Sequence, residues 1–220
     1  MEPHMALLGF KKSFSRQLFT SNKDQDFIVD YSLGVIDRFN MAKNKAGIVI
    51  EPSIDIHNTP IEKVYARITT RKIGHVLQLR TIGNLLAELR ANPSGKYQVR
   101  NQSLDLFLFG EEDIDATAKK LIDYFKKDVL PYIEKYATWK GLDDILNNNL
   151  SFNTVHCLIE PERSIRGLIL AKLTGRKDLD ELIVRHSDRI RSMSNENSKI
   201  ELNRLLEILD SLPVLDNEPI

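Results

Sequence analysis

The pair of residues best placed for acid–base chemistry in this sequence is Asp55 and His57. On a β-strand, residues two positions apart point to the same face, where a carboxylate can orient an imidazole ring. His75 is a candidate third partner of such a site. The simpler alternative is that both side chains face solvent at the end of a strand. An enzyme built around Asp55 and His57 is therefore kept as one hypothesis, behind a non-catalytic function.

A second candidate for chemistry is the neighbouring pair His156 and Cys157, because a histidine can activate a thiolate as a nucleophile. Adjacent residues on a strand point to opposite faces, so Cys157 is better explained as a small buried apolar residue. The five histidines show no ligand spacing, and the phosphate-loop, nucleophile-elbow and zinc-helix motifs are missing from the sequence. We therefore assign no catalytic residues, no metal ligands and no cofactor, and favour a protein that is not an enzyme.

Basic residues are concentrated between positions 63 and 104, where eight Lys or Arg side chains accompany a single acid, Glu88. If the arginines of this segment converge in the fold, their guanidinium groups can bind phosphates. Against this, no aromatic interleaving and no known nucleic-acid motif accompanies them. A nucleic-acid or phosphate-binding module is the second hypothesis, and its candidate residues are Arg67, Arg71, Lys72, Arg80 and Arg90.

The net charge of the chain is zero, but the two halves of the chain carry opposite charges. Residues 1–110 hold 15 basic and 10 acidic side chains, a net charge of +5, whereas residues 111–220 hold 16 and 21, a net charge of −5. An acidic surface speeds and selects the association of a basic partner protein. The expected partner contact lies in the acidic half, at Asp178, Asp180, Glu181 and Asp188.

The strands that must position these side chains are expected in the first half of the chain. Alternation of apolar and polar residues over 26–39 and 48–56 predicts two half-buried strands, and Pro52 predicts an edge or a bulge in the second. Further short strands are expected over 14–19, 75–80, 96–100 and 104–109, with the last two paired as a hairpin.

One helix interrupts this half, and helices dominate the rest. Thr59, Pro60 and Glu62 have the pattern of a helix start, with Thr59 and Glu62 as a capping box. A long amphipathic helix is expected from Glu111, with a kink or break at Pro131. Three more helices are expected after the Asn-rich stretch 147–149, starting near 161, 179 and 198, the last with a capping box at 198–201.

These elements predict an α+β fold. An antiparallel or mixed sheet of four to six strands with helices on one face is expected in residues 1–150, followed by a helical subdomain in residues 151–220 that packs on it.

The composition is that of a folded domain. With 220 residues, of which 42% are hydrophobic, the chain can bury a sizeable core. No stretch reaches the roughly 18 consecutive apolar residues of a membrane span, and the first residues lack the pattern of a signal peptide. The single cysteine excludes an internal disulfide. We therefore expect a soluble, cytoplasmic protein that does not contact a membrane.

Three runs of residues form a pattern that is known from other proteins. They are Leu7-Leu8-Gly9-Phe10-Lys11-Lys12, then Asp113-Ile114-Asp115 at the start of a long helix, and Leu130-Pro131 at its end. In these runs the chain resembles a bacterial family of small α+β proteins of unknown function, over about residues 7–146, and residues 168–175 are similar to the family's tail. Almost nothing precedes Leu7, so the family's first helix is expected to be missing or shortened here.

The resemblance carries no catalytic residue over to this chain. It implies one function, because some members are similar to immunity proteins encoded beside bacterial toxins. The leading hypothesis is therefore a bacterial protein that binds another protein, most specifically an immunity protein that neutralises a toxin. The nucleic-acid or phosphate-binding module and the enzyme are its alternatives.

Overall fold

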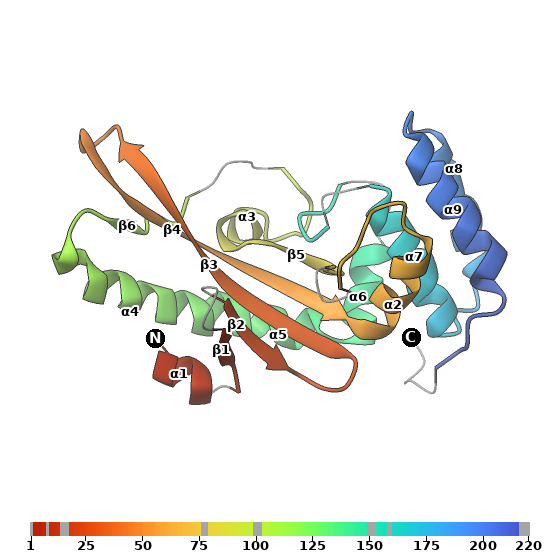
Figure 1. Ribbon diagram of the computed structural model, residues 1–220, viewed down its shortest axis with the longest axis horizontal. Coiled ribbons are helices and arrows are strands. Elements are labelled where there is room, and N and C mark those ends of the chain that lie inside the picture. Colours follow the sequence, from red (N-terminus) through yellow and green to blue (C-terminus); the bar gives the residue numbers. More distant parts are fainter. Residues whose placement is uncertain are drawn as a thin grey trace.

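The computed structural model describes residues 2–7, 9–13, 18–75, 79–98, 103–148, 153–157 and 160–215. They form a six-stranded antiparallel sheet together with helices that lie mostly in the C-terminal half (Figure 1). This arrangement confirms the predicted α+β class. No helix in the described ranges has the length and apolar character needed to cross a membrane.

The sheet is centred on two long strands of 14 residues each. The strands are β1 (Lys11–Ser13), β2 (Leu18–Asn22), β3 (Phe27–Asn40), β4 (Lys45–Asn58), β5 (Ile82–Leu85) and β6 (Phe107–Leu108). Their order in the sheet is β1-β2-β3-β4-β5, and β6 also pairs with β4. Both long strands agree with the alternation in the sequence, but β4 begins earlier than expected and forms one continuous hairpin with β3.

Pro52 lies in a central strand, contrary to the simplest expectation for a proline. On one side it is opposite Leu33 of β3. On the other side, β5 pairs with β4 only from Ser53 onward, and β6 pairs with Ile48 and Val49. Pro52 therefore falls in the gap between two short neighbours, where its missing N–H group is not needed by a strand ladder.

The remaining short strands differ from the expectation. Residues 14–17, 76–78 and 99–102 lie outside the described residues, and with them parts of the strands expected at 14–19, 75–80 and 96–100. The described part of the strand expected at 75–80, residues 75, 79 and 80, is not in a strand, and the strand of this region is β5, Ile82–Leu85. The hairpin expected between 96–100 and 104–109 is wrong in its described part, because β6 pairs with β4 and Lys96 bridges to Thr154.

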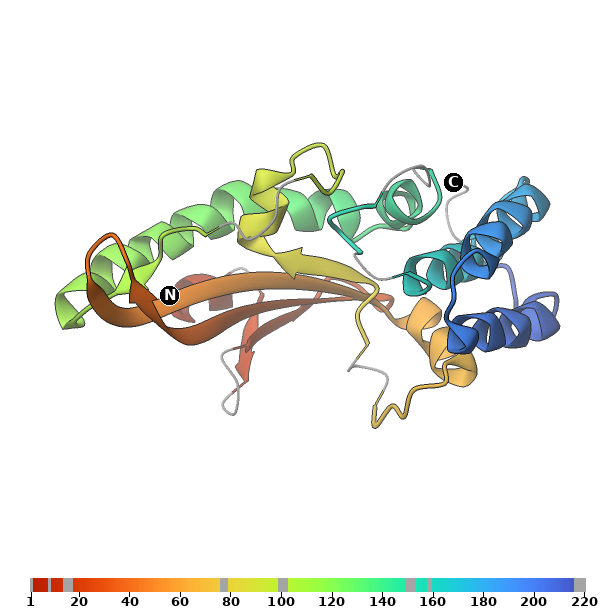
Figure 2. The same ribbon diagram turned by 90° about the horizontal axis from the view of Figure 1, so that it is seen from above.

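One face of the sheet is covered by helices. Figure 2 shows α3 (Leu86–Ala91), α4 (Ile114–Tyr124) and α5 (Leu130–Tyr136) on the same side of the strands. Tyr31 of β3 meets Phe125 on this face edge to face, with ring centroids 5.1 Å apart. Between α4 and α5 the chain makes a π-helical turn, η3 (Phe125–Val129), and Pro131 sits in the first turn of α5. The long helix therefore continues past the proline as a kinked extension, which is one of the two expected forms.

The other helices assemble at one end of the sheet. They are α2 (Thr59–Ile68), α6 (Trp139–Leu146), α7 (Glu162–Leu173), α8 (Leu179–Arg191) and α9 (Glu196–Leu209). Two short elements lie elsewhere, α1 (Glu2–Leu7) and the 3₁₀ turn η2 (Glu111–Asp113). Helix α7 is almost entirely buried and packs against α2, α6, α8 and α9. Because the buried apolar cluster includes residues from Met5 to Leu212, the hydrophobic core is continuous across residue 150.

Two expected capping boxes are wrong. Helix α2 is capped by Asn58, whose side chain accepts a hydrogen bond from the Ile61 backbone N–H, while Glu62 is buried against α7. Helix α9 begins two residues before Ser198 and is capped by Asn195. Glu62 pairs instead with Arg166, and Glu201 accepts hydrogen bonds from Thr69 and Thr70; these partners are far away in the sequence, so local patterns do not reveal them.

Candidate functional site

Asp55 and His57 share a face of β4, as their spacing predicts, but they do not form the pair that the sequence suggests. The carboxylate at His57 belongs to Asp30 of β3, with Nε2 and Oδ2 3.1 Å apart. The Thr20 hydroxyl of β2 donates to the other oxygen of Asp30 at 2.6 Å. Asp55 is paired instead with Arg80 at 3.0 Å. Asp30 was missed because strand register, which sequence spacing does not give, brings it next to His57.

Both ring nitrogens of His57 face acceptors. Nε2 faces the Asp30 carboxylate, and Nδ1 bonds the Leu79 backbone carbonyl. Two acceptors require an N–H on each nitrogen, which is the protonated imidazolium form. Burial opposes that charge, but the hydrogen bond and charge of Asp30, with the Leu79 carbonyl, outweigh burial and raise the pKa of His57. A ring held in this way has no nitrogen left to act as a general base.

The basic segment does not gather into one surface. Arg71 pairs with Glu162 at 2.6 Å, Arg80 pairs with Asp55, and Arg90 pairs with Asp128 while its guanidinium lies 4.7 Å from the Tyr124 ring centroid. Figure 2 shows α3, which carries Arg90, on the opposite side of the sheet from the segment that follows α2. Arg67 and Lys72 are exposed. Arg90 therefore lies apart from the segment that follows α2, and three of the five candidate side chains are held in ion pairs with different acids.

The acidic residues expected to contact a partner lie around α8. Asp178 pairs with Arg176 at 2.7 Å and Glu181 pairs with Arg185 at 3.5 Å, while Asp180 and Asp188 are exposed. Arginines at 185, 189 and 191 share the helix with these acids. The surface of α8 is therefore mixed in charge, and its partner role stays a prediction.

His156 and Cys157 are not arranged as a base and nucleophile. His156 Nδ1 faces the Tyr132 hydroxyl at 3.2 Å. Burial raises the pKa of the Cys157 thiol to about 11, so near neutral pH the sulfur keeps its proton. Within the described ranges, no group of three His, Cys, Asp or Glu side chains is arranged to hold a metal ion.

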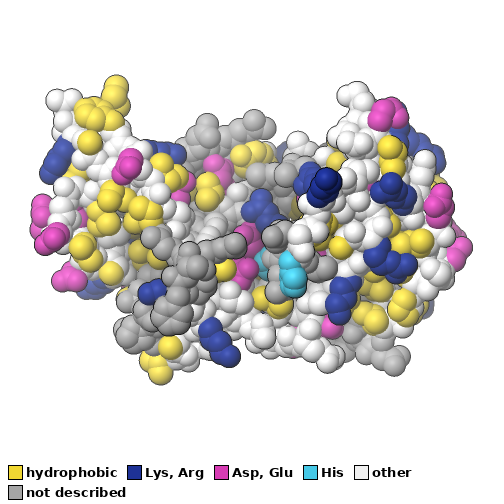
Figure 3. Space-filling model, viewed as in Figure 1, with side chains coloured by type: hydrophobic (Ala, Val, Ile, Leu, Met, Phe, Trp, Pro, Cys, Tyr) yellow, Lys and Arg dark blue, Asp and Glu magenta, His cyan; other side chains and the backbone are white. Residues whose placement is uncertain are grey.

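The most exposed apolar region of the described chain is the outer half of the β3–β4 hairpin. We call it the β-arm, and define it as residues 33–40 of β3, residues 45–52 of β4 and the turn between them. Figure 1 shows it projecting beyond the rest of the sheet, and Figure 3 shows hydrophobic side chains gathered at the same end. The exposed fractions are 47% for Val35, 56% for Phe39, 85% for Met41 and 37% for Ile48.

Strand alternation places three of these side chains together. Val35 and Phe39 are four residues apart on β3, and Ile48 is opposite Asp37, which lies between them. All three therefore share one face of the arm. A shallow groove borders this face, lined by residues 37–39 and 46–48. A contiguous apolar patch on an exposed element is typical of an interaction site.

The β-arm also has a free strand edge. Strand β2 pairs with β3 only along Ile28–Ser32. Within the described part of the chain, no strand pairs with residues 33–40 on that side. Such an edge presents a row of unpaired backbone donors and acceptors to solvent, where another strand can bind. A signal for this arm is the length of its strands. β3 and β4 have 14 residues each, and few neighbouring strands are long enough to cover them.

Comparison of this chain with known proteins found no matching family model, no matching curated protein and no matching solved structure. The resemblance noted from the sequence therefore stays a prediction, and the function is argued from the geometry of the chain alone.

Proposed function

We propose that this protein binds another protein, and that the β-arm is the surface that makes the contact. The observation that carries the proposal is the exposure of Val35, Phe39 and Ile48 on one face of a two-stranded arm beside an open strand edge. Exposed apolar patches and open edges promote non-specific association unless a partner covers them. The immunity function that the resemblance implies is one form of this proposal, in which the partner is a toxin.

The edge and the charges of the β-arm indicate the chemistry of the partner. An extended segment can add to the edge of residues 33–40 as a further strand, with backbone hydrogen bonds for affinity and alternate side chains for specificity. The charged side chains of the β-arm are Asp37, Arg38, Lys43, Lys45 and Glu51, a net charge of +1, and Arg38 pairs with Glu51 at 3.0 Å. Lys43 and Lys45 lie 4.5 and 5.5 Å from the centroid of the Phe109 ring. An extended segment with apolar and acidic side chains complements this surface.

Site-specific photo-crosslinking in the native cell tests the proposal. The photoreactive residue is placed at Phe39 on the arm, at Asp180 on α8, and at Ile200 on α9 as an exposed apolar control. The expected result is a discrete protein adduct from position 39 and none from position 200. An adduct from position 180 alone would transfer the partner surface to α8 and contradict the proposal.

A binding variant provides the second arm of the test. Phe39→Ser combined with Met41→Ser removes exposed apolar surface, so the melting temperature should change little while the adduct partner is lost. Ile200→Ser is the matched control and should keep the partner. Equal binding by the two variants would show that the β-arm is not the contact surface. An adduct of twice the chain mass would identify the partner as a second copy.

A further inference from the structure

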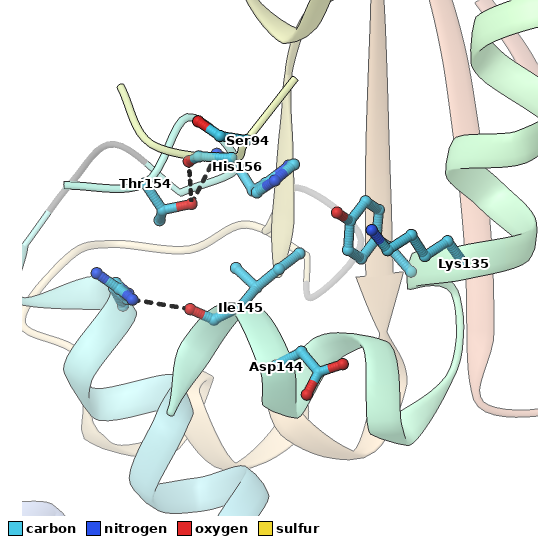
Figure 4. A pocket seen from close by; sticks show the side chains of 9 residues that line it. Ser94, Lys135, Asp144, Ile145, Thr154 and His156 are labelled. Carbon is cyan, nitrogen blue, oxygen red and sulfur yellow. Dashed lines mark hydrogen bonds between the residues drawn. The ribbon is translucent and has the colours of Figure 1, made fainter. Parts of the chain in front are cut away.

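A small pocket opens where five segments of the chain meet, away from the β-arm. It has a volume of about 260 Å³ and lies between the turn after α3, the end of α5, helix α6 with the start of α7, and residues 153–157. Figure 4 shows His156 in its wall, between Ser94 and Thr154 on one side and Lys135 on the other. The Thr154 hydroxyl donates to the Gly95 carbonyl at 3.2 Å and ties two of these segments together.

His156 presents an unused nitrogen at this pocket. The side chain is 6% exposed, and its Nδ1 faces the Tyr132 hydroxyl at 3.2 Å. Among the described residues, Nδ1 is the only acceptor within hydrogen-bond distance of the Tyr132 hydroxyl, so the phenol donates its proton to Nδ1. Nε2 then carries the N–H, and it has no hydrogen-bond partner among the described residues. A Cβ atom at Gly95 would lie 3.0 Å from Nε2, so the glycine keeps this space open.

The charges around the ring favour an anion. Lys135 stands at the rim, and Arg163 lies deeper, 1% exposed, with one amino group donating to the Ile145 carbonyl at 2.9 Å. Asp144 is the acid of the lining, and it is exposed and accepts a hydrogen bond from Asn148 at 2.8 Å. Two cations and one acid leave the lining with a net positive charge, and the neutral donors of Ser94, Thr154 and His156 add to it.

We propose that this pocket binds a small oxyanion, a carboxylate or a phosphate group, between Lys135 and the Nε2–H group of His156. The pocket volume of about 260 Å³ is smaller than the roughly 300–1,000 Å³ typical of sites for drug-sized ligands. The ligand is therefore limited to a small molecule or a single anionic group. The site is independent of the β-arm, and it adds ligand binding to the proposed protein-binding function.

Nuclear magnetic resonance of protein with ¹⁵N-labelled histidine tests the site. Sodium phosphate and sodium acetate are titrated separately at constant ionic strength, with sodium chloride as the reference. The expected result is a saturable shift of the His156 ring resonances with at least one oxyanion. A shift with phosphate alone assigns a phosphate ligand, and one with acetate assigns a carboxylate. No saturable shift with either salt, or the same shift with chloride, would overturn the proposal.

A pH titration of the same resonances separates ligand contact from a structural role. The groups facing His156 are Tyr132, Tyr136, Lys135, Arg163 and Asp144. Burial, together with the charges of Lys135 and Arg163, lowers the pKa of His156 to about 4. A bound anion offsets those two charges, so the pKa of His156 should rise when the oxyanion is present. An unchanged pKa at saturating oxyanion would contradict direct contact.

Two lysine variants complete the test. Lys135→Met removes the rim cation and should weaken oxyanion binding by about tenfold, while Lys135→Arg should retain most of it. Lys140→Met is the matched control, because Lys140 is an exposed lysine on the next helix and does not line the pocket. Equal affinities of Lys135→Met and Lys140→Met would overturn the proposal. Phe39→Ser should not change oxyanion binding, so this result is separate from the test of the β-arm.

Discussion

Arg166 of α7 and Glu62 of α2 form a bidentate ion pair across 104 residues of sequence. Their atoms lie 2.7 and 3.0 Å apart, and each side chain is 1% exposed. The Thr81 hydroxyl donates to Glu62 at 2.7 Å, Glu162 accepts from Arg166 at 2.9 Å, and the guanidinium lies 4.1 Å from the Tyr65 ring centroid. The ion pair therefore links α7 to α2, the helix that directly follows β4.

Breaking this ion pair from one side should strongly destabilise the protein. Glu62→Gln leaves the Arg166 charge buried with less compensation, and the expected loss in the free energy of unfolding is about 3–5 kcal/mol. Urea unfolding of wild type and variant measures this loss. The double variant Glu62→Leu with Arg166→Met removes both charges and should lose less than the sum of the two single variants. Additive losses would show that the two residues stabilise the fold independently.

The Asp30–His57 pair should make the free energy of unfolding fall as the pH becomes alkaline. The folded pKa of His57 is raised above its ordinary value of 6.5, so the pair contributes fully below that pH. This contribution should be lost as the pH rises through the raised pKa of folded His57. Urea unfolding across the neutral to alkaline range measures it, with Asp30→Asn as the comparison. The variant should lose most of this pH dependence, and an unchanged slope would show that Asp30 does not hold the imidazolium.

Buried neutral histidines have the opposite effect at acidic pH. His186 is fully buried, its Nε2 lies 2.9 Å from Asn147 Oδ1, and burial followed by the charges of Arg163, Arg189 and Arg185 lowers its pKa to about 3. The contribution of the neutral ring to the free energy of unfolding is complete above pH 6.5 and is lost as the pH falls toward the folded pKa, by roughly 5 kcal/mol in total.

His186→Gln tests this acid sensitivity. The variant should lose less stability than the wild type between neutral pH and about pH 5, measured by urea unfolding at each pH. Val184→Gln is the control, because Val184 is exposed on the same helix and has no titratable group, so its substitution should leave the acid slope unchanged. If both variants followed the wild-type slope, the acid sensitivity would have to come from other groups, such as His156.

A fragment of residues 1–150 should not fold into a stable unit. Helix α7 is buried along nearly all its length, and Ile165, Leu168 and Ile169 are 0% exposed within the same apolar cluster as the sheet residues Ile54 and Ile56. Removing α7 uncovers the apolar surfaces of α2 and α6. Circular dichroism and amide dispersion of the fragment measure the outcome. A cooperative unfolding transition of the fragment would establish residues 1–150 as an autonomous domain.

The sequence by itself determined the elements whose patterns are long and local. Alternation over residues 26–39 predicts β3, because period-two burial requires an extended chain. Helical spacing after Glu111 predicts the helices that cover the sheet, and Gly175, just after α7, has the left-handed conformation that glycine favours at a helix end. These features depend on residues within a few positions of one another, so sequence spacing is sufficient to reveal them.

The tertiary structure alone decided which side chains meet. Strand register gave His57 the carboxylate of Asp30 in place of Asp55, and the packing of α7 turned Glu62 from an expected cap into the partner of Arg166. The length over which neighbouring strands cover β3 decided that the β-arm is exposed. Each of these relations depends on the spatial arrangement of distant segments, and the distances between such segments are fixed by packing, which leaves no periodic pattern in the sequence.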